Sequence, residues 1–469
     1  MKNLLKKPTS EISDDKKTRY EIFNLKENPF PNTPFVNKVS PDDRYNGRIY
    51  ESKIREAERT QIIENFVKEP QSNPNHIRLG YIIDNSYVGR GNGKSAFTLD
   101  LIDKINFDYS LDISNDVNKC FGLHISPLPS GKSKTFYDFV DLIFEEIINK
   151  NLINYCLASL RLEVIIEKFS DQIDLEKDFE DQKDLVSKLN SSHFFKGKNF
   201  TISDITREFY QKKEFSKISA DFILNRDKNN FYGSNVANQD DFKKYFEGLK
   251  KGKQRIDFIF NDLVLFFEAS GFNGSYIIID DFERIPDFQS EKLKQEFALE
   301  IRTNFFDGVL ENARIGFYNL ILVLHAGVPR LVEKSWSTSG MERRSPMLSE
   351  NGDISKHIIY FNKLNYNQAR SLLEIYLEKY RIHPTPENKI FPFTEKAIEL
   401  IAEKSEYNAS TILERAFSLI EKAIIEEIAE INDVYVNEKL GKKDDWESDF
   451  QNDISKEDSD DLFSKSKKQ

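Results

Sequence analysis

Short apolar runs alternate with longer stretches of helical periodicity through much of the chain. Each run is a few residues long and ends in polar or turn-forming residues, which is typical of strands buried on both faces of a parallel sheet. The predicted strands are 79–84, 121–125, 275–281, 319–325 and 357–361. The predicted helices are 51–67, 96–105, 136–149, 152–169, 255–267, 292–310, 366–380, 394–404 and 410–430.

This alternation predicts an α/β fold, with a parallel sheet flanked by helices and a separate helical domain after it. Changes in composition along the chain suggest further boundaries. The segment 28–35 contains prolines that enforce an extended path, and Phe30 and Phe35 are expected to anchor it on the next domain. The expected parts are a flexible arm (1–27), a core (28–149 and 256–364), a helical insertion (150–255), a helical domain (365–440) and an acidic disordered tail (441–469).

Basic and aromatic residues are interleaved within the predicted insertion. They form either a groove for nucleic acid or a solvated helix face above a phenylalanine core, and nearby acids such as Glu208 and Glu214 favour the second interpretation. The residues concerned are Lys196, Lys198, Arg207, Lys212, Lys213, Lys217, Phe194, Phe195, Phe200, Phe209 and Tyr210.

Composition narrows the class of protein. The 469 residues are 39% hydrophobic, enough for substantial cores, and no apolar run approaches the roughly 20 residues that span a bilayer. No signal peptide is recognised, so we expect a cytoplasmic protein that does not bind membranes. The two cysteines are expected to be buried thiols. A net charge of −11 argues against a protein that coats nucleic acid non-specifically.

A glycine-rich segment directly after the first predicted strand has the composition of a phosphate-binding loop. Alternate glycines let backbone N–H groups approach anionic oxygens, Lys94 adds a charge for the β- and γ-phosphates, and Ser95 offers a hydroxyl to Mg²⁺. The usual pattern has its first glycine at position 88, where this chain has Val88. The predicted nucleotide-binding residues are Gly89, Arg90, Gly91, Asn92, Gly93, Lys94 and Ser95.

A second signal is the apolar run 276–279, which is followed by Asp280, Asp281 and Glu283. In open α/β sheets ligands bind at the carboxyl ends of strands, where these acids are placed. We therefore expect Asp280 to hold the Mg²⁺ that bridges the nucleotide phosphates. Either Asp281 or Glu283 would orient or deprotonate the attacking water.

These motifs, their order and the trailing helical domain resemble the AAA+ ATPases and the related STAND proteins. The Asn28-Pro29-Phe30 segment, the helix after it and the phosphate loop resemble the branch that contains ExeA, transposition regulators and origin-recognition proteins. The resemblance implies a P-loop NTPase core with a helical lid, ATP and Mg²⁺ as cofactors, and homo-oligomers in which a neighbour's arginine reaches the γ-phosphate. Similar ATPases are also frequent in bacterial anti-phage systems.

The resemblance carries over to four further residues. His325, at the end of the fourth strand, takes the place of a polar sensor, although a buried structural histidine is an equal alternative. Arg343 and Arg344 lie in the region of the arginine finger, and surface charges are the alternative there. Arg415 in the helical domain lies about one turn after the position of the usual sensor arginine, and is assigned to the nucleotide on that basis.

The leading functional hypothesis is an ATP-hydrolysing protein that assembles on DNA, or on a DNA-processing partner protein, and remodels or loads it. The alternative is a STAND-like switch or scaffold in signalling or defence that holds nucleotide and turns over slowly, which Asp281 in place of the usual glutamate favours. A third hypothesis, an interaction module with a vestigial site, is opposed by the intact Lys94, Ser95 and Asp280.

Overall fold

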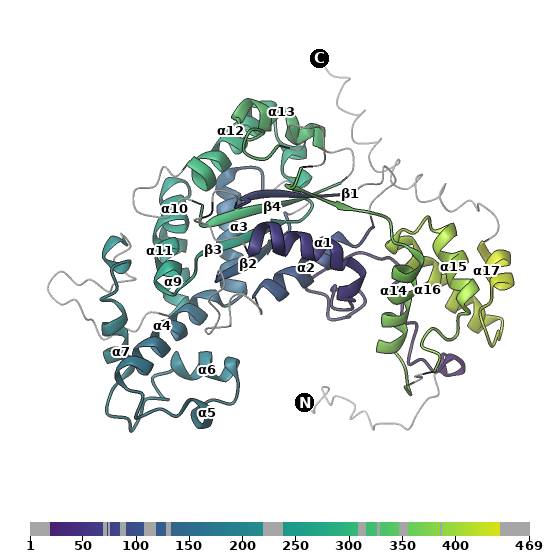
Figure 1. The fold of residues 1–469 in the computed structure, drawn as a ribbon, viewed down its shortest axis with the longest axis horizontal. Coiled ribbons are helices and arrows are strands. Elements are labelled where there is room, and N and C mark those ends of the chain that lie inside the picture. The colour runs from purple at the N-terminus through teal and green to yellow at the C-terminus, as the bar shows by residue number, and fades with distance from the viewer. Residues whose placement is uncertain are drawn as a thin grey trace, which may run out of the picture. The chain divides into compact units, whose positions relative to one another are not determined.

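The computed structural model describes residues 19–68, 73, 76–84, 91–106, 119–127, 133–218, 238–307, 316–325, 329–346, 355–384 and 387–440. The predicted tail and the first 18 residues of the predicted arm lie outside these residues. The chain divides into two compact units, one formed by residues 55–362 and the other by residues 1–54 and 363–469. Each unit is described by itself, and Figure 1 shows their elements.

A five-stranded parallel sheet forms the centre of the unit 55–362. Its order is β2-β3-β4-β1-β5, so that β1 lies between β4 and β5, and β3 lies between β2 and β4. The prediction of a parallel α/β sheet with flanking helices, consistent with a P-loop NTPase fold, is confirmed. The strands are β1 (Leu79–Asp84), β2 (Cys120–Ile125), β3 (Gly274–Ile279), β4 (Tyr318–Leu324) and β5 (Ile358–Phe361).

Helices pack on both faces of this sheet, which explains why its strands are apolar throughout. Alternate residues of a strand face opposite sides. Tyr81 joins the large aromatic cluster on one face, whereas its neighbour Gly80 faces the ring of Phe66 on the other. A Cβ atom on Gly80 would collide with that ring, and one on Gly122 would collide with Ile102. Glycine therefore lets the helices approach the backbone of β1 and β2 closely.

The helices of this unit match most predicted positions, but several predicted single helices are broken. The predicted helix 51–67 is a succession of 3₁₀, α and π turns, and the helices 255–267 and 292–310 contain similar π segments, which hydrophobic periodicity does not distinguish. Helix α13 was not predicted. The elements around the sheet are η2 (Ser52–Arg55), α1 (Glu56–Ile62), η3 (Ile63–Val67), α2 (Lys94–Ile105), α3 (Phe136–Asn149), α10 (Lys253–Asp257), η6 (Phe258–Asp262), α11 (Leu263–Ala269), η7 (Phe282–Arg284), η8 (Pro286–Phe288), α12 (Glu291–Ile301), η9 (Arg302–Asp307) and α13 (Pro329–Ser339).

The predicted insertion packs against the same core as the sheet. Its aromatic residues Phe195, Phe200 and Phe209 are buried, while basic residues are engaged by acids, as in the pairs Lys212–Glu163 and Lys198–Asp178. Of the two interpretations, this supports the helix face above an aromatic core. The elements of this segment are α4 (Leu152–Lys168), α5 (Leu175–Asp178), α6 (Gln182–Leu189), α7 (Ile202–Phe209), η5 (Phe215–Lys217) and α9 (Gln239–Gly248).

The second unit combines the N-terminal segment with the C-terminal helices. Phe30 is fully buried there, with its ring centroid 6.0 Å from that of Tyr376 and 6.1 Å from that of Phe393. The expectation that this segment anchors on the following sheet domain is therefore wrong, and Phe35 is exposed. Residues 19–27 are not a free arm either, since Phe23 is also buried. The helices are η1 (Glu21–Phe23), α14 (Tyr366–Lys379), α15 (Glu395–Lys404), α16 (Ala409–Ile425) and α17 (Asp433–Leu440).

Both cysteines, Cys120 and Cys156, are buried free thiols, as expected. Burial raises the pKa of each thiol above its usual value, which keeps them protonated. No helix in the described part of the chain has both the length and the apolar character needed to cross a membrane.

Candidate functional site

The predicted phosphate loop leads from β1 into helix α2. Gly89 and Arg90 lie outside the described residues, which resume at Gly91. Gly91 and Gly93 have positive φ angles of 111° and 82°, a region that glycine enters without the penalty that a Cβ atom imposes. Gly93 forms the N-cap of α2, and Lys94 is the first residue of the helix. The backbone N–H groups of this first turn have no partner within the helix, which suits them to an anion.

Lys94 is buried and forms an ion pair with Asp84, the last residue of β1. Asp84 also accepts a hydrogen bond from Asn92 Nδ2 at 2.9 Å, so one carboxylate holds two residues of the loop. Burial opposes the ionisation of Asp84, but its contacts with His325, Lys94 and Asn92 together hold its pKa below the usual value. Asp84 is therefore a fixed negative charge beneath the phosphate loop.

The two predicted Mg²⁺ ligands, Ser95 and Asp280, lie together although they are far apart in the sequence. Asp280 follows β3 directly, and its carboxylate accepts a hydrogen bond from the Ser95 hydroxyl. Burial and the neighbouring charge of Asp281 raise the pKa of Asp280, and they outweigh the opposing effects of the Ser95 hydrogen bond and of Lys94. Hydroxyl and carboxylate oxygens are ligands that Mg²⁺ prefers. The residues present therefore fit a Mg²⁺ ion carried in with a nucleotide.

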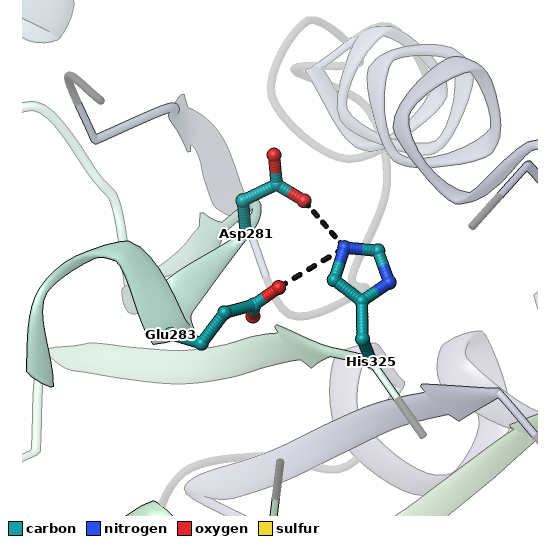
Figure 2. A group of neighbouring side chains, drawn as sticks. All are labelled: Asp281, Glu283 and His325. Carbon is teal, nitrogen blue, oxygen red and sulfur yellow. Dashed lines mark hydrogen bonds and ion pairs between the residues drawn. The ribbon is translucent and has the colours of Figure 1, made fainter. Parts of the chain in front are cut away.

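Asp281 and Glu283 converge on His325, which follows β4 (Figure 2). His325 Nε2 lies 3.0 Å from Asp281 Oδ1 and 3.0 Å from Glu283 Oε1. Asp281 adopts a left-handed conformation with φ of 48°, which turns the chain sharply after β3. Aspartate tolerates this region better than most residues, and such backbone strain is found mainly where the surrounding structure fixes it.

His325 connects these acids to the phosphate loop. Its Nδ1 atom lies 3.3 Å from Lys94 Nζ and 3.7 Å from Asp84 Oδ2. Burial by itself would lower the pKa of His325, but its interactions with the carboxylates of Asp281, Asp84 and Glu283 raise it to about 10. The residues that follow β1, β3 and β4 thus form one continuous polar network.

Two residues of this network were not predicted. One is Asp84, and the other is His124 in β2, which is buried with Nε2 3.0 Å from Thr98 Oγ1 and 3.9 Å from Asp280 Oδ2. Both belong to the carboxyl ends of strands. Their position could have revealed them in the sequence, because ligands bind at the carboxyl ends of strands and this argument had already placed Asp280 at the site.

The two arginines predicted to act on the γ-phosphate lie elsewhere in this unit. Arg344 forms an ion pair with Asp307, and both residues lie close enough to Arg78 for their charges to affect its pKa. Arg78 directly precedes β1, whereas Lys94 follows its far end. A six-residue strand is about 20 Å long, so Arg344 cannot reach the phosphate loop of its own chain. Arg343, next to it, is exposed.

Arg415 lies within α16 of the other unit. Its assignment to the nucleotide stays a prediction.

Comparisons with known proteins add little to what the geometry of the site shows. No protein-family model matches the chain, and no curated protein matches it either. Among solved structures, the ORC2 protein of Aeropyrum pernix, determined in ADPNP and ADP complexes, is similar with a TM-score of 0.36 and 9% sequence identity. The similarity covers 87% of this chain and 69% of that protein. At this score and identity the likeness transfers neither binding nor activity.

Proposed function

We propose that the protein binds ATP with Mg²⁺ and hydrolyses it, as an AAA+-like ATPase that assembles with further copies of itself. The observation that carries this proposal is the meeting of Ser95, at the start of α2, with Asp280, at the end of β3. A phosphate-binding helix start after β1 and a buried carboxylate after β3, at the same edge of the sheet, are the two parts that P-loop hydrolysis of a nucleotide requires.

The side chains suggest a division of roles. Lys94 and the backbone N–H groups from Gly91 onward would hold the phosphates, while Ser95 and Asp280 would hold Mg²⁺, which neutralises charge that develops on the phosphates. Glu283 is favoured over Asp281 as the residue that orients the attacking water. Arg284 Nη2 binds Asp281 Oδ2 at 2.5 Å, whereas the oxygens of the buried Glu283 accept no hydrogen bond from the described residues.

Oligomerisation is proposed because Arg344, and with it the neighbouring Arg343, lies far from the phosphate loop of its own chain. Arg343 is the better candidate for action on a neighbouring subunit, because it is exposed and makes no ion pair with the described residues. Arg344 is engaged by Asp307. An arginine supplied by a partner typically accelerates phosphoryl transfer by about 10³- to 10⁵-fold. Turnover per subunit is therefore expected to rise with protein concentration.

For the biological role, we propose action on DNA or on a DNA-processing protein partner, as the sequence resemblance implies. A STAND-like switch, in signalling or defence, is the second candidate. The ion pair between Lys94 and Asp84 favours the switch, because it gives the nucleotide-free loop a satisfied state of its own. Two satisfied states of the phosphate loop, one without nucleotide and one with nucleotide bound, are what a nucleotide-dependent switch requires.

ATP hydrolysis by the purified protein tests these alternatives. Wild type and Lys94→Ala are compared with and without single- and double-stranded DNA, over a series of protein concentrations. Turnover that rises with DNA and concentration, and disappears in Lys94→Ala, supports the assembling ATPase. Tight nucleotide retention, with near-zero turnover that does not change when DNA is added, supports the switch. Equal ATP binding by wild type and Lys94→Ala contradicts the site assignment.

A further inference from the structure

Three side chains beside the nucleotide site have the arrangement of a metal centre. Asp281, Glu283 and His325 each direct one ligand atom to a common point, and these atoms lie within 4.8 Å of one another. Figure 2 shows both carboxylates pointing at the same ring nitrogen of the histidine. None of the three was expected to bind Mg²⁺, which is assigned to Ser95 and Asp280.

The distances suit direct coordination. Ligand atoms bound at adjacent positions of one ion, at bond lengths of about 2.0–2.2 Å, lie about 3 Å apart. His325 Nε2 lies 3.0 Å from the nearest oxygen of each carboxylate. A small rotation of the side chains would therefore place an ion between the three atoms, and no backbone movement is required.

Glu283 gives an independent reason to place a cation here. Its side chain is 3% exposed, and neither of its carboxylate oxygens accepts a hydrogen bond within the described part of the chain. A buried carboxylate without hydrogen bonds is costly, because desolvation is not compensated. Among the described residues, Glu283 forms an ion pair with His325, on the side where the other two ligand atoms lie. A metal ion that displaces the proton on His325 Nε2 would take over from the imidazolium as the positive charge beside this carboxylate.

The surroundings also suit a metal. The other ring nitrogen of His325, Nδ1, lies 3.7 Å from Asp84 Oδ2, and metal-binding histidines commonly have a carboxylate beside the second nitrogen. The side chains of His325 and Asp281 are 17% and 19% exposed, so water can complete the coordination sphere and ions can enter. Arg284 occupies the remaining oxygen of Asp281 and fixes its orientation.

We propose that Asp281, Glu283 and His325 form a second metal site that binds a divalent transition-metal ion of the Zn²⁺ or Mn²⁺ type. The imidazole decides the class of ion. Mg²⁺ and Ca²⁺ take oxygen ligands, whereas imidazole together with carboxylates suits Zn²⁺ and other first-row transition metals. Three protein ligands and an open position are typical of reactive rather than purely structural zinc sites.

The site has a consequence for turnover that rests on the proposed function. An ion bound to Glu283 and Asp281 occupies both carboxylates from which the water-orienting residue is drawn. The metal-bound protein therefore retains ATP but hydrolyses it slowly, while the metal-free protein turns over. Metal binding itself does not depend on the ATPase assignment.

Titration of Zn²⁺ into chelator-stripped, nucleotide-free protein, followed by calorimetry, tests the site. Wild type is expected to bind one equivalent tightly. His325→Asn and Glu283→Gln are expected to weaken that equivalent by at least about 10- to 100-fold, the loss that removal of an outer-shell partner alone causes. The matched control is His193→Asn, the same substitution at an exposed histidine, which should leave it unchanged.

A second pair of measurements separates this proposal from the proposed function. Lys94→Ala should weaken ATP binding and keep the Zn²⁺ equivalent, and addition of Zn²⁺ to wild type should leave ATP bound while turnover falls. Glu283→Gln is nearly isosteric, so circular dichroism should match wild type and a loss of Zn²⁺ cannot then be due to misfolding. The metal site is overturned if wild type binds no Zn²⁺ tightly. It is also overturned if wild type, His325→Asn and Glu283→Gln bind Zn²⁺ equally. Both conclusions hold whatever the ATPase result.

Discussion

Removal of the charge on Asp84 tests how Lys94 is held in the absence of nucleotide. Asp84 is buried, forms an ion pair with Lys94 and accepts a hydrogen bond from Asn92. The substitution Asp84→Asn keeps the size of the side chain and one oxygen that can accept hydrogen bonds, but it removes the negative charge. Lys94 is itself buried, so water cannot replace the lost interaction.

The size of the effect follows from the kind of bond that is lost. A hydrogen bond to a charged group contributes about 1.5–3 kcal/mol and a neutral one about 0.5–1.5 kcal/mol, so the free protein should lose about 1–2 kcal/mol of stability. When a triphosphate binds, its oxygens become the partner of Lys94 in wild type and variant alike. The cost is then confined to the free state. Because about 1.4 kcal/mol corresponds to a tenfold change, Asp84→Asn should bind ATP about 5- to 30-fold more tightly.

Urea unfolding without nucleotide and equilibrium ATP binding with Mg²⁺ measure the two sides of this prediction. The double variant Asp84→Asn, Lys94→Ala closes a mutant cycle, in which the gain in affinity should disappear because the lysine is absent. Weaker ATP binding by Asp84→Asn, or unchanged affinity together with unchanged stability, would refute the reasoning. The first result would mean that Lys94 keeps Asp84 as its partner when nucleotide is bound, and the second that the ion pair does not stabilise the free protein.

Three further predictions concern other parts of the sheet unit. Arg343→Ala should reduce concentration-dependent turnover by about 10³-fold or more without weakening ATP binding. Arg344→Ala should mainly lower stability, because it removes the ion pair with Asp307. Equal turnover in the two variants would argue against Arg343 as the arginine finger. Gly80→Ala should cost about 1–3 kcal/mol in urea unfolding, because the added Cβ meets the ring of Phe66. Burial lowers the pKa of His357 below its usual value of about 6.5. The free protein should therefore lose stability as the pH falls below about 6.5, because the unfolded chain takes up the proton more readily. Unfolding measured from pH 8 to 5 should show a smaller dependence on pH for His357→Gln than for wild type.

The sequence predicted the strands well because their environment leaves a local signature. All five lie within one sheet, and their residues are buried with the single partial exception of one residue in β5, so each reads as a short apolar run. Helix α3 begins and ends at the predicted residues. Thr135 and Asp138 form a capping box at its start, and that signal is also local.

Other features could not be read from local patterns. The predicted helix 51–67 contains a π segment, η3, whose apolar residues have the same spacing as those of an α-helix. Phe30 was expected to pack on the following domain and packs instead with the C-terminal helices. An apolar residue shows that it will be buried, but not against which surface.

The sequence by itself determined the chemical groups of the candidate site and the ends of the strands that carry them. Lys94 and Ser95 follow one strand and Asp280 another, because a glycine-rich turn and an apolar run that ends in acids are local patterns. Only the tertiary structure decided which groups meet. It placed Asp84 against Lys94, and it brought Asp281 and Glu283 to one nitrogen of His325. Such contacts depend on strand order and on the packing of the whole core, and these are fixed by interactions between residues far apart in the chain.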